Sequence, residues 1–393
     1  MTVETRTEGA TLVVGLSGSI DSLTSPQMEE TIRNAIDRYD PEAVTLDCDK
    51  LEYITSAGLR VILRLKQRFG NLRLINVHNE VYGVLSLTGF TELMTVEKAY
   101  RVFSVYGCEA IGHGANGKVY RIDADTIVKV YRNPDALPEI RRERELARAA
   151  FVAGIPTAIP YDVVRIEGGG YGSVFELLNA TSFAELLIRH EKTVGEMAAM
   201  SIDLLKLIHS KTIRSDVLPS MKETVLGWME FLRGLLTERQ FDRLRALVAA
   251  VPDDEHVVHG DFHLKNIMLQ NNEALLIDMD TLSHGNPVFE LACMYNAYHG
   301  FGCTDHEETR RFLGIDWDTA TAFWRKSLSL YLNTEDEETL RAAENKIMIV
   351  SSIRIIHHYI RHGGLENAVS CATIEHWKAV LNDLLPTTET ILL

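Results

Sequence analysis

Three polar residues in one segment have the side-chain types that phosphoryl transfer requires. Asp261 and Asn266 precede the apolar run 267–269, and Asp278 follows a second apolar run, 274–277. Short runs rich in Ile and Leu around polar residues predict a loop, a strand, a turn and a second strand. A carboxylate orients the attacking hydroxyl in such a reaction, and an amide with a second carboxylate holds Mg²⁺. The segment therefore predicts a site for magnesium-assisted phosphoryl transfer.

The spacing of these residues is that of a kinase catalytic loop and metal-binding loop: His-x-Asp-x-x-x-x-Asn from His259, an apolar strand, and Ile-Asp. With Gly260 where protein kinases have Arg, the segment resembles the kinase-like phosphotransferases of the aminoglycoside phosphotransferase superfamily. The resemblance implies that Asp261 is the catalytic base and that Asn266 and Asp278 are Mg²⁺ ligands.

One position departs from that pattern, and two other interpretations of the loop stay open. Where the superfamily usually has Asp, this chain has Glu290, which keeps the acid on a side chain one methylene longer. His256, His259 and His263 are candidate zinc ligands, although no Cys lies nearby and the spacing fits no common zinc pattern. Alternatively, the polar loop is only a hairpin connection with Asp and Asn caps.

Length, charge and cysteine usage restrict the class of protein. A chain of 393 residues suggests two or three domains. The net charge of -15 argues against broad nucleic-acid binding and mildly suits a cationic acceptor. Five scattered cysteines without a CxxC fit a reducing cytoplasm. The N-terminal residues lack a signal-peptide pattern and no apolar stretch approaches a membrane span, so we expect a cytoplasmic protein without membrane partners.

Residues 1–97 predict a compact α/β domain, a sheet covered by helices. Strands expected at 11–16, 43–47 and 71–77 alternate with helical patterns, which implies a sheet with helices packed on it. The pattern also predicts a turn over 17–21 and then a helix with Ser25 as its N-cap.

This domain resembles a STAS domain of the anti-sigma-factor-antagonist type. The resembling segments are 18–21, 51–59 and 85–90. The resemblance implies that Ser56 is a phosphorylation switch on a surface that binds an anti-sigma factor or switch kinase. The Asp that usually precedes this serine is Thr55 here. The alternative for Ser56 is a plain helix N-cap.

A glycine-rich stretch follows the first domain. Gly112, Gly114 and Gly117 satisfy G-x-G-x-x-G. A Walker A loop needs Ser or Thr after its lysine, and this chain has Val119 instead. A dinucleotide-binding fingerprint opens a helix, whereas the residues that follow here are rich in β-formers. The stretch therefore predicts a β-hairpin whose backbone folds over the phosphates of ATP.

The next strand contains the lysine that such a hairpin requires. Lys129 lies in the apolar run 127–131, where an unpaired charge would be costly to bury. Its acidic partner should come from the following helix, 138–153. Glu143 fits best because the apolar positions at +3, +4 and +7 continue its helix face, and Glu145 is the alternative.

A strand over 173–178 is expected to enter the hinge between two lobes, where the backbone near Glu176 and Leu178 would meet the adenine edge. The rest of the chain is mostly amphipathic helix. His358 and His362 are spaced i, i+4, but no third metal ligand accompanies them. The resulting fold is an α+β bilobal protein-kinase-like domain, with an N-lobe over 98–180 and a mainly helical C-lobe over 181–393.

The glycine hairpin, the strand lysine and the Asp-Asn-Asp set occur in kinase order. We therefore expect an ATP- and Mg²⁺-dependent phosphotransferase that acts on a hydroxyl of a small molecule or of a protein serine. Fusion to a STAS domain favours signalling over antibiotic resistance. The alternative is a nucleotide-sensing regulatory protein without turnover. Intact Lys129, Asp261 and Asp278 favour the enzyme.

Overall fold

A computed structural model gives the structure, and it describes residues 1–113, 117–214, 216–362 and 365–393. Contacts divide the chain into two compact units: residues 1–104 with 164–167, and residues 105–163 with 168–393. Within the described ranges, no helix is long and apolar enough to cross a membrane.

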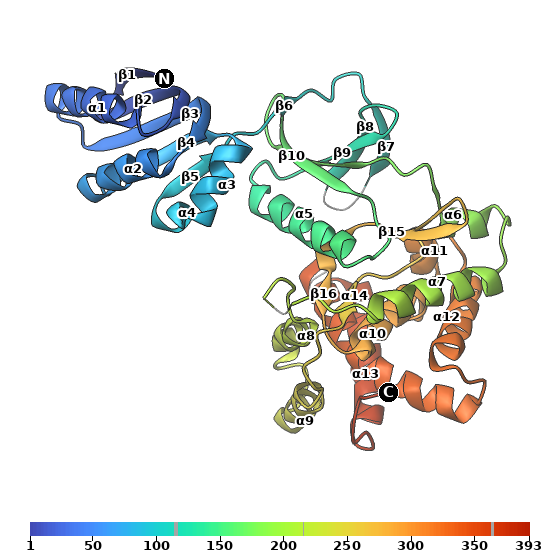
Figure 1. Ribbon diagram of the computed structural model, residues 1–393. Coiled ribbons are helices and arrows are strands. Elements are labelled where there is room, and N and C mark those ends of the chain that lie inside the picture. Colours follow the sequence, from blue (N-terminus) through green and yellow to red (C-terminus); the bar gives the residue numbers. More distant parts are fainter. Residues whose placement is uncertain (114–116, 215, 363–364) are drawn as a thin grey trace. The chain divides into compact units, whose positions relative to one another are not determined.

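The first unit is built on a five-stranded sheet of order β1-β2-β3-β4-β5 (Figure 1), in which β1 is antiparallel to β2 and the other neighbours are parallel. Helices pack on this sheet and close an apolar core. The α/β class predicted from the sequence is confirmed. The elements are β1 (Thr2–Glu8), β2 (Thr11–Ile20), α1 (Ser25–Tyr39), β3 (Ala43–Ile54), α2 (Ser56–Arg68), β4 (Arg73–Val77), α3 (Asn79–Leu87), α4 (Phe90–Leu93) and β5 (Thr95–Lys98).

The sequence patterns missed two features of this sheet. Strand β1 was not predicted because it is an edge strand whose side chains are mostly exposed, so it has no apolar alternation. The turn predicted over 17–21 is wrong for its first four residues, since β2 continues to Ile20. There Ser17 pairs with Lys50 and Ile20 with Ile54 of β3, beyond a bulge that re-aligns the two strands.

The predicted N-cap of α1 is also wrong. Ser25 is the first helical residue, and the N-cap is Thr24, whose side chain makes no cap hydrogen bond. Instead, Asp21 Oδ1 accepts hydrogen bonds from the amides of Leu23 (2.8 Å) and Thr24 (2.9 Å). An aspartate turn of this kind satisfies the amides that precede the helix.

A second sheet and one long helix follow; of its strands, β6 and residues 164–166 of β10 are counted in the first unit and the others in the second. The sheet has the order β6-β10-β11-β9-β8-β7, in which β7 and β8 pair antiparallel on either side of the glycine-rich stretch and β8 and β9 pair antiparallel next to them. Gly117 is required at the start of β8, because a Cβ there would lie 2.1 Å from the carbonyl oxygen of Val130. The elements are β6 (Val102–Phe103), β7 (Glu109–His113), β8 (Gly117–Arg121), β9 (Thr126–Tyr131), α5 (Leu137–Val152), β10 (Pro160–Ile166) and β11 (Tyr171–Glu176).

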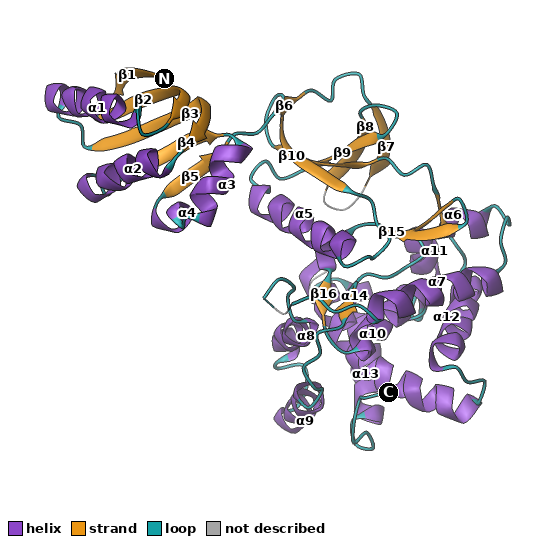
Figure 2. Cartoon of the chain, viewed as in Figure 1, coloured by secondary structure: helices purple, strands orange, loops and turns teal. Residues whose placement is uncertain are grey.

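The remainder of the chain is mainly helical, as the sequence predicted (Figure 2). It contains β12 (Thr181–Ser182), α6 (Phe183–Ile188), α7 (Val194–His209), α8 (Met221–Met229), η1 (Glu230–Leu232), α9 (Glu238–Ala249), β13 (Val257–Val258), β14 (Ile267–Gln270), β15 (Glu273–Leu276), η2 (Met279–Thr281), β16 (Ser283–His284), α10 (Pro287–Tyr298), η3 (Gly300–Gly302), α11 (His306–Leu313), α12 (Trp317–Leu332), α13 (Glu337–His362) and α14 (Ala368–Leu384).

Helix α13 is the element of this part that matters most for the site. Its residues Ile347, Ile353 and Ile356 are fully buried, and the helix packs against α8, α10 and α14. Burial on several sides fixes the rotation and depth of the helix. Side chains that leave α13 towards the catalytic segment are therefore held in place by the core.

Candidate active site

The predicted catalytic loop, residues 259–266, lies between two short β-pairings. Strand β13 enters it, and the hairpin of β14 and β15 follows, turning through Asn271 and Asn272 with positive φ angles of 51° and 63°. At the base of the hairpin, the amide of Ile277 donates to the carbonyl oxygen of Asn266 over 2.9 Å. This bond sets Asn266 beside the residue that precedes Asp278, so the hairpin holds both predicted metal ligands at one end.

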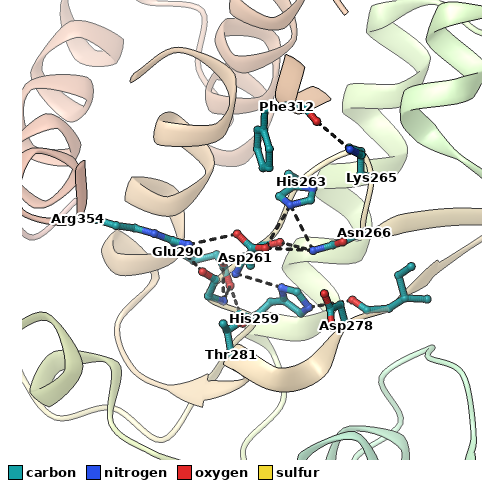
Figure 3. Close-up of polar contacts among 12 residues, drawn as sticks. His259, Asp261, His263, Lys265, Asn266, Asp278, Thr281, Glu290, Phe312 and Arg354 are labelled. Carbon is teal, nitrogen blue, oxygen red and sulfur yellow. Dashed lines mark hydrogen bonds and ion pairs between the residues drawn. The ribbon is translucent and has the colours of Figure 1, made fainter. Parts of the chain in front are cut away.

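Asp261 is held from two sides (Figure 3). One carboxylate oxygen, Oδ2, lies 3.2 Å from His263 Nε2, and the other, Oδ1, accepts from Arg354 Nη2 at 3.2 Å. The Asn266 amide donates to the Asp261 carbonyl oxygen over 3.0 Å. Burial alone would raise the pKa of Asp261, but His263 and then Arg354 outweigh it and lower the pKa below its usual value. The carboxylate is therefore ionised and oriented at neutral pH.

Gly260 and Glu290 shape the loop that carries Asp261. Gly260 has a φ of +81°, and a Cβ there would lie 2.8 Å from the carbonyl oxygen of Thr281. A larger residue does not fit this turn. The fully buried carboxylate of Glu290 accepts the amides of Gly260 (3.1 Å) and His259. Although its side chain is longer than that of the expected Asp, Glu290 still reaches the loop and binds its backbone.

Burial dominates the electrostatics of Glu290. It raises the pKa of this carboxyl to about 7, against the lowering effect of the two backbone hydrogen bonds. His259 is buried as well, and burial lowers its pKa. The neutral ring accepts the Asp261 amide at Nδ1 (3.2 Å), so Nε2 is the atom that donates to the carbonyl oxygen of Ile277 (3.3 Å). His259 thus ties the catalytic loop to the strand before Asp278.

Lys129 joins the β-rich part to the segment that contains Asp278. Its Nζ lies 2.8 Å from Glu143 Oε1 and 2.8 Å from Asp278 Oδ1. Glu143 is buried on α5, whereas Glu145, the alternative partner, is exposed. Burial would lower the pKa of Lys129, but the charges of Asp278 and Glu143 outweigh it and raise the pKa. The lysine is therefore a permanent cation between two carboxylates.

Of the three glycines in the predicted phosphate loop, Gly112 lies in β7 and Gly117 opens β8. Gly114 falls outside the described residues. At the predicted hinge, the Glu176 amide donates to the carbonyl oxygen of Ile159 (3.0 Å), and its side chain accepts the Ile159 amide (3.2 Å). Leu178 follows the end of β11. Both residues remain predictions as nucleotide contacts.

The donor set fits Mg²⁺ better than zinc. Asn266 uses its amide nitrogen towards Asp261, which leaves its amide oxygen available as an acceptor. Mg²⁺ prefers oxygen ligands and commonly takes few from the protein when phosphates supply the others. The candidate zinc histidines have separate partners: His263 contacts Asp261, and His256 contacts Asp254. Across the described ranges, no three His, Cys, Asp or Glu side chains are grouped to hold a metal.

The sequence did not single out several residues of this site. Arg354 reaches Asp261 from α13, Tyr131 donates its hydroxyl to Glu143 Oε2, and Asp280 lies beside Asp278 with its pKa raised to about 7, chiefly by burial and then by Asp278. In the sequence, Asp280 is a second acid two residues beyond the predicted ligand Asp278. Arg354 had no comparable signal, because its partner is distant in the sequence.

Comparison with known proteins identifies both parts of the chain. Residues 107–323 match the family described as the phosphotransferase enzyme family. The chain belongs to this family. Residues 2–103 match the STAS domain family. The chain is thus a phosphotransferase-family protein with an N-terminal STAS domain.

Two proteins of similar sequence are named anti-sigma factor antagonists. BtrV of Bordetella bronchiseptica, which carries the name anti-sigma factor antagonist, is 34% identical over 89 residues, covering 22% of this chain and 76% of that protein. The anti-sigma F factor antagonist of Paenibacillus polymyxa is 30% identical over 89 residues, which cover 22% of this chain and 76% of that protein. Among solved structures, the ADP-bound aminoglycoside phosphotransferase APH(2'')-Ib is 18% identical, with 72% of this chain and 94% of that chain covered and a TM-score of 0.46.

In the STAS domain, Ser56 is exposed at the first position of α2. The N-cap is Thr55, so the capping alternative for Ser56 does not describe this structure. The Thr55 hydroxyl instead donates to the carbonyl oxygen of Ile20 over 3.1 Å, which anchors the turn to β2. Ser56 therefore presents its hydroxyl to solvent at a rigid helix N-terminus.

Proposed function

We propose that this phosphotransferase-family protein moves the γ-phosphoryl group of ATP to a hydroxyl group with the help of Mg²⁺. The observation that supports this most is the position of Lys129, 2.8 Å from both Glu143 and Asp278. A lysine so placed binds the α- and β-phosphates and stays paired to a helix glutamate. Asp261 then accepts the acceptor's proton, and Gly112 and Gly117 place backbone near the phosphates.

Asn266 and Asp278 would hold Mg²⁺, which neutralises the charge that develops on the transferred phosphoryl group. The chain's own residues do the positioning. Glu290 and His259 hold the loop, and Asp261 orients the attacking hydroxyl while Lys129 orients the phosphates. Glu176 and Leu178 would provide backbone groups for the adenine. In this proposal, residues 98–180 form the N-lobe and residues 181–393 the C-lobe.

Replacing Lys129 with Ala should weaken ATP binding by at least about tenfold, because a phosphate contact and the pairing of Glu143 are lost together. Calorimetric titration of ATP measures this loss. A double-mutant cycle of Lys129→Ala and Glu143→Ala should show a coupling of about 1–3 kcal/mol. The matched control is Glu145→Ala, which should be additive with Lys129→Ala. Unchanged ATP affinity in Lys129→Ala would contradict the proposed role.

We propose further that Ser56 is a phosphorylation switch on a surface that binds an anti-sigma factor. The similarity to anti-sigma factor antagonists and the exposure of Ser56 support this. Phosphorylation adds about 1.5 to 2 negative charges. The N-terminus of α2 tolerates them, with about 0.3–1 kcal/mol of favourable dipole interaction. A partner docked on this surface would have to desolvate the new charge, and that cost should release it.

Ser56→Asp should therefore keep the thermal melting temperature of the STAS domain while reducing binding of a partner, and Ser56→Ala should bind normally. Binding is measured by calorimetry against an anti-sigma factor of the kind that such antagonists recognise. Asn34→Asp is the control, since it adds one negative charge at an exposed position of α1. Equal binding by Ser56→Asp and wild type, with no phosphate found on Ser56 by mass spectrometry, would remove the proposal.

A further inference from the structure

The side of Asp261 that faces α13 is lined by basic residues. Arg354 donates to the Gly260 carbonyl oxygen over 2.7 Å and to Asp261 Oδ1 over 3.2 Å, and 21% of its side chain stays exposed. His357, His358 and Arg361 follow at three, four and seven residues along the helix. This spacing places all four on one face of α13. The basic face thus begins at the proposed catalytic base and runs outwards.

Aromatic rings flank this basic face. The Trp228 ring lies 5.7 Å from the Arg354 guanidinium carbon and stacks on His357 at 5.6 Å and 18°. Phe231, 45% exposed, meets His357 edge-on at 4.7 Å, and Phe301 meets His358 edge-on at 5.2 Å. Apolar rings beside fixed cations suit a ligand that has both an apolar face and a charged group.

The charges around these histidines are mainly positive. Burial lowers the pKa of His357 to about 4, and Arg361, His362 and Arg354 lower it further. Burial likewise lowers the pKa of His358 to about 4, with His362 and Arg354 next, whereas Glu308 opposes them.

The negative charge that opposes them, on Glu308, is already ion-paired. Arg311 pairs with Glu308 at 2.6 Å, which offsets that acid's attraction for a cation. Arg354 is paired with Asp261, and Arg361, two turns further along α13, adds a second positive charge on this side.

We propose that the acceptor is a small hydroxylated anion, a hydroxy acid or a sugar or polyol phosphate, whose negative group binds the Arg354–Arg361 face of α13. The proposal rests on the phosphotransferase function proposed above. The acceptor hydroxyl must come within hydrogen-bond reach of Asp261, about 3 Å. A cationic acceptor in that position would bring its charges against Arg354. An anionic one meets Arg361 and those N–H groups of Arg354 that Gly260 and Asp261 do not use.

The spacing between Arg354 and Arg361 favours a small acceptor molecule. Arg354 and Arg361 are two helical turns apart, roughly 10 Å at 1.5 Å per residue. An anionic group held between them lies within that distance of the hydroxyl at Asp261. The net charge of -15 by itself suits a cationic acceptor, whereas Arg361 adds positive charge on the acceptor side.

The test is transfer from γ-labelled ATP by the full-length protein to hydroxylated compounds in three charge classes. These are aminoglycosides and amino sugars, neutral sugars and polyols, and sugar acids, hydroxy acids and sugar phosphates. We expect label in the anionic class. Label in only the cationic or neutral class, or on the protein itself, overturns the proposal but leaves the phosphotransferase function standing. No transfer to any class despite Mg²⁺-dependent ATP binding contradicts that function too.

A charge-neutralising variant tests the face itself. Arg361→Gln should raise KM for the anionic acceptor by at least about tenfold and reduce the salt dependence of kcat/KM, with KM for ATP unchanged. Arg341→Gln is the matched control, because Arg341 is exposed on the same helix but about 30 Å from Arg361 along its axis. Equal acceptor KM values for the two variants would overturn the proposed anion site.

Discussion

Asp261→Asn should retain ATP binding and lose phosphoryl transfer by at least about a thousandfold. The amide keeps the shape of the side chain but cannot accept the hydroxyl proton, and a positioned base contributes about 10²–10⁴-fold. A thousandfold loss corresponds to about 4 kcal/mol of activation barrier. Single-turnover transfer from labelled ATP measures the rate, and calorimetry measures the binding.

The control for Asp261→Asn is Asp253→Asn, which makes the same chemical change at an exposed carboxylate that pairs with Lys222. It should leave the transfer rate unchanged. Because Asp261 is ion-paired to Arg354, the variant also leaves Arg354 without its carboxylate partner, so its melting temperature must be measured beside its activity. Full activity in a folded Asp261→Asn protein would remove Asp261 from its role as base.

Asp278→Ala should abolish the part of ATP affinity that depends on Mg²⁺, together with transfer. Titrations of ATP with and without Mg²⁺ should differ by at least about tenfold in the wild type and coincide in the variant. Removing Asp278 also leaves Lys129 with one carboxylate instead of two. Metal-free ATP binding should therefore stay the same or improve, because less negative charge faces the phosphates.

Glu273→Ala is the matched control for Asp278→Ala, since Glu273 is an exposed acid on the same β14–β15 hairpin. It should preserve the difference between the two titrations. A Mg²⁺ effect of the same size in Asp278→Ala would place the metal on other residues, of which Asp280 is the nearest acid in the sequence.

The parts of the site that follow from the sequence are those set by local structure. Two apolar runs and an Asn-Asn turn predict the hairpin that holds Asn266 and Asp278. The pairing of Lys129 with Glu143 follows from an apolar strand and the buried face of the next helix. In each case, the residues that fix the geometry lie in the same or the next secondary-structure element along the chain.

The parts that do not follow depend on distant packing. Arg354 contacts Asp261 across 93 residues of sequence, and it does so because the buried isoleucines of α13 fix that helix against α10. Nothing near Arg354 in the sequence marks it as a site residue. The edge strand β1 was missed for a related reason. Its exposed residues show no strand pattern, and it is a strand because it pairs with β2.

The most direct test of the central claim is the fate of the γ-phosphoryl group. Purified protein is incubated with γ-labelled ATP, Mg²⁺ and the panel of hydroxylated compounds, and label is measured in ATP, acceptor, protein and free phosphate. Label should move from ATP to a hydroxyl compound with the wild type and stay in ATP with Asp261→Asn. If wild-type protein binds ATP with Mg²⁺ but all label stays in ATP, the proposed phosphotransferase activity is contradicted and the result indicates a nucleotide sensor.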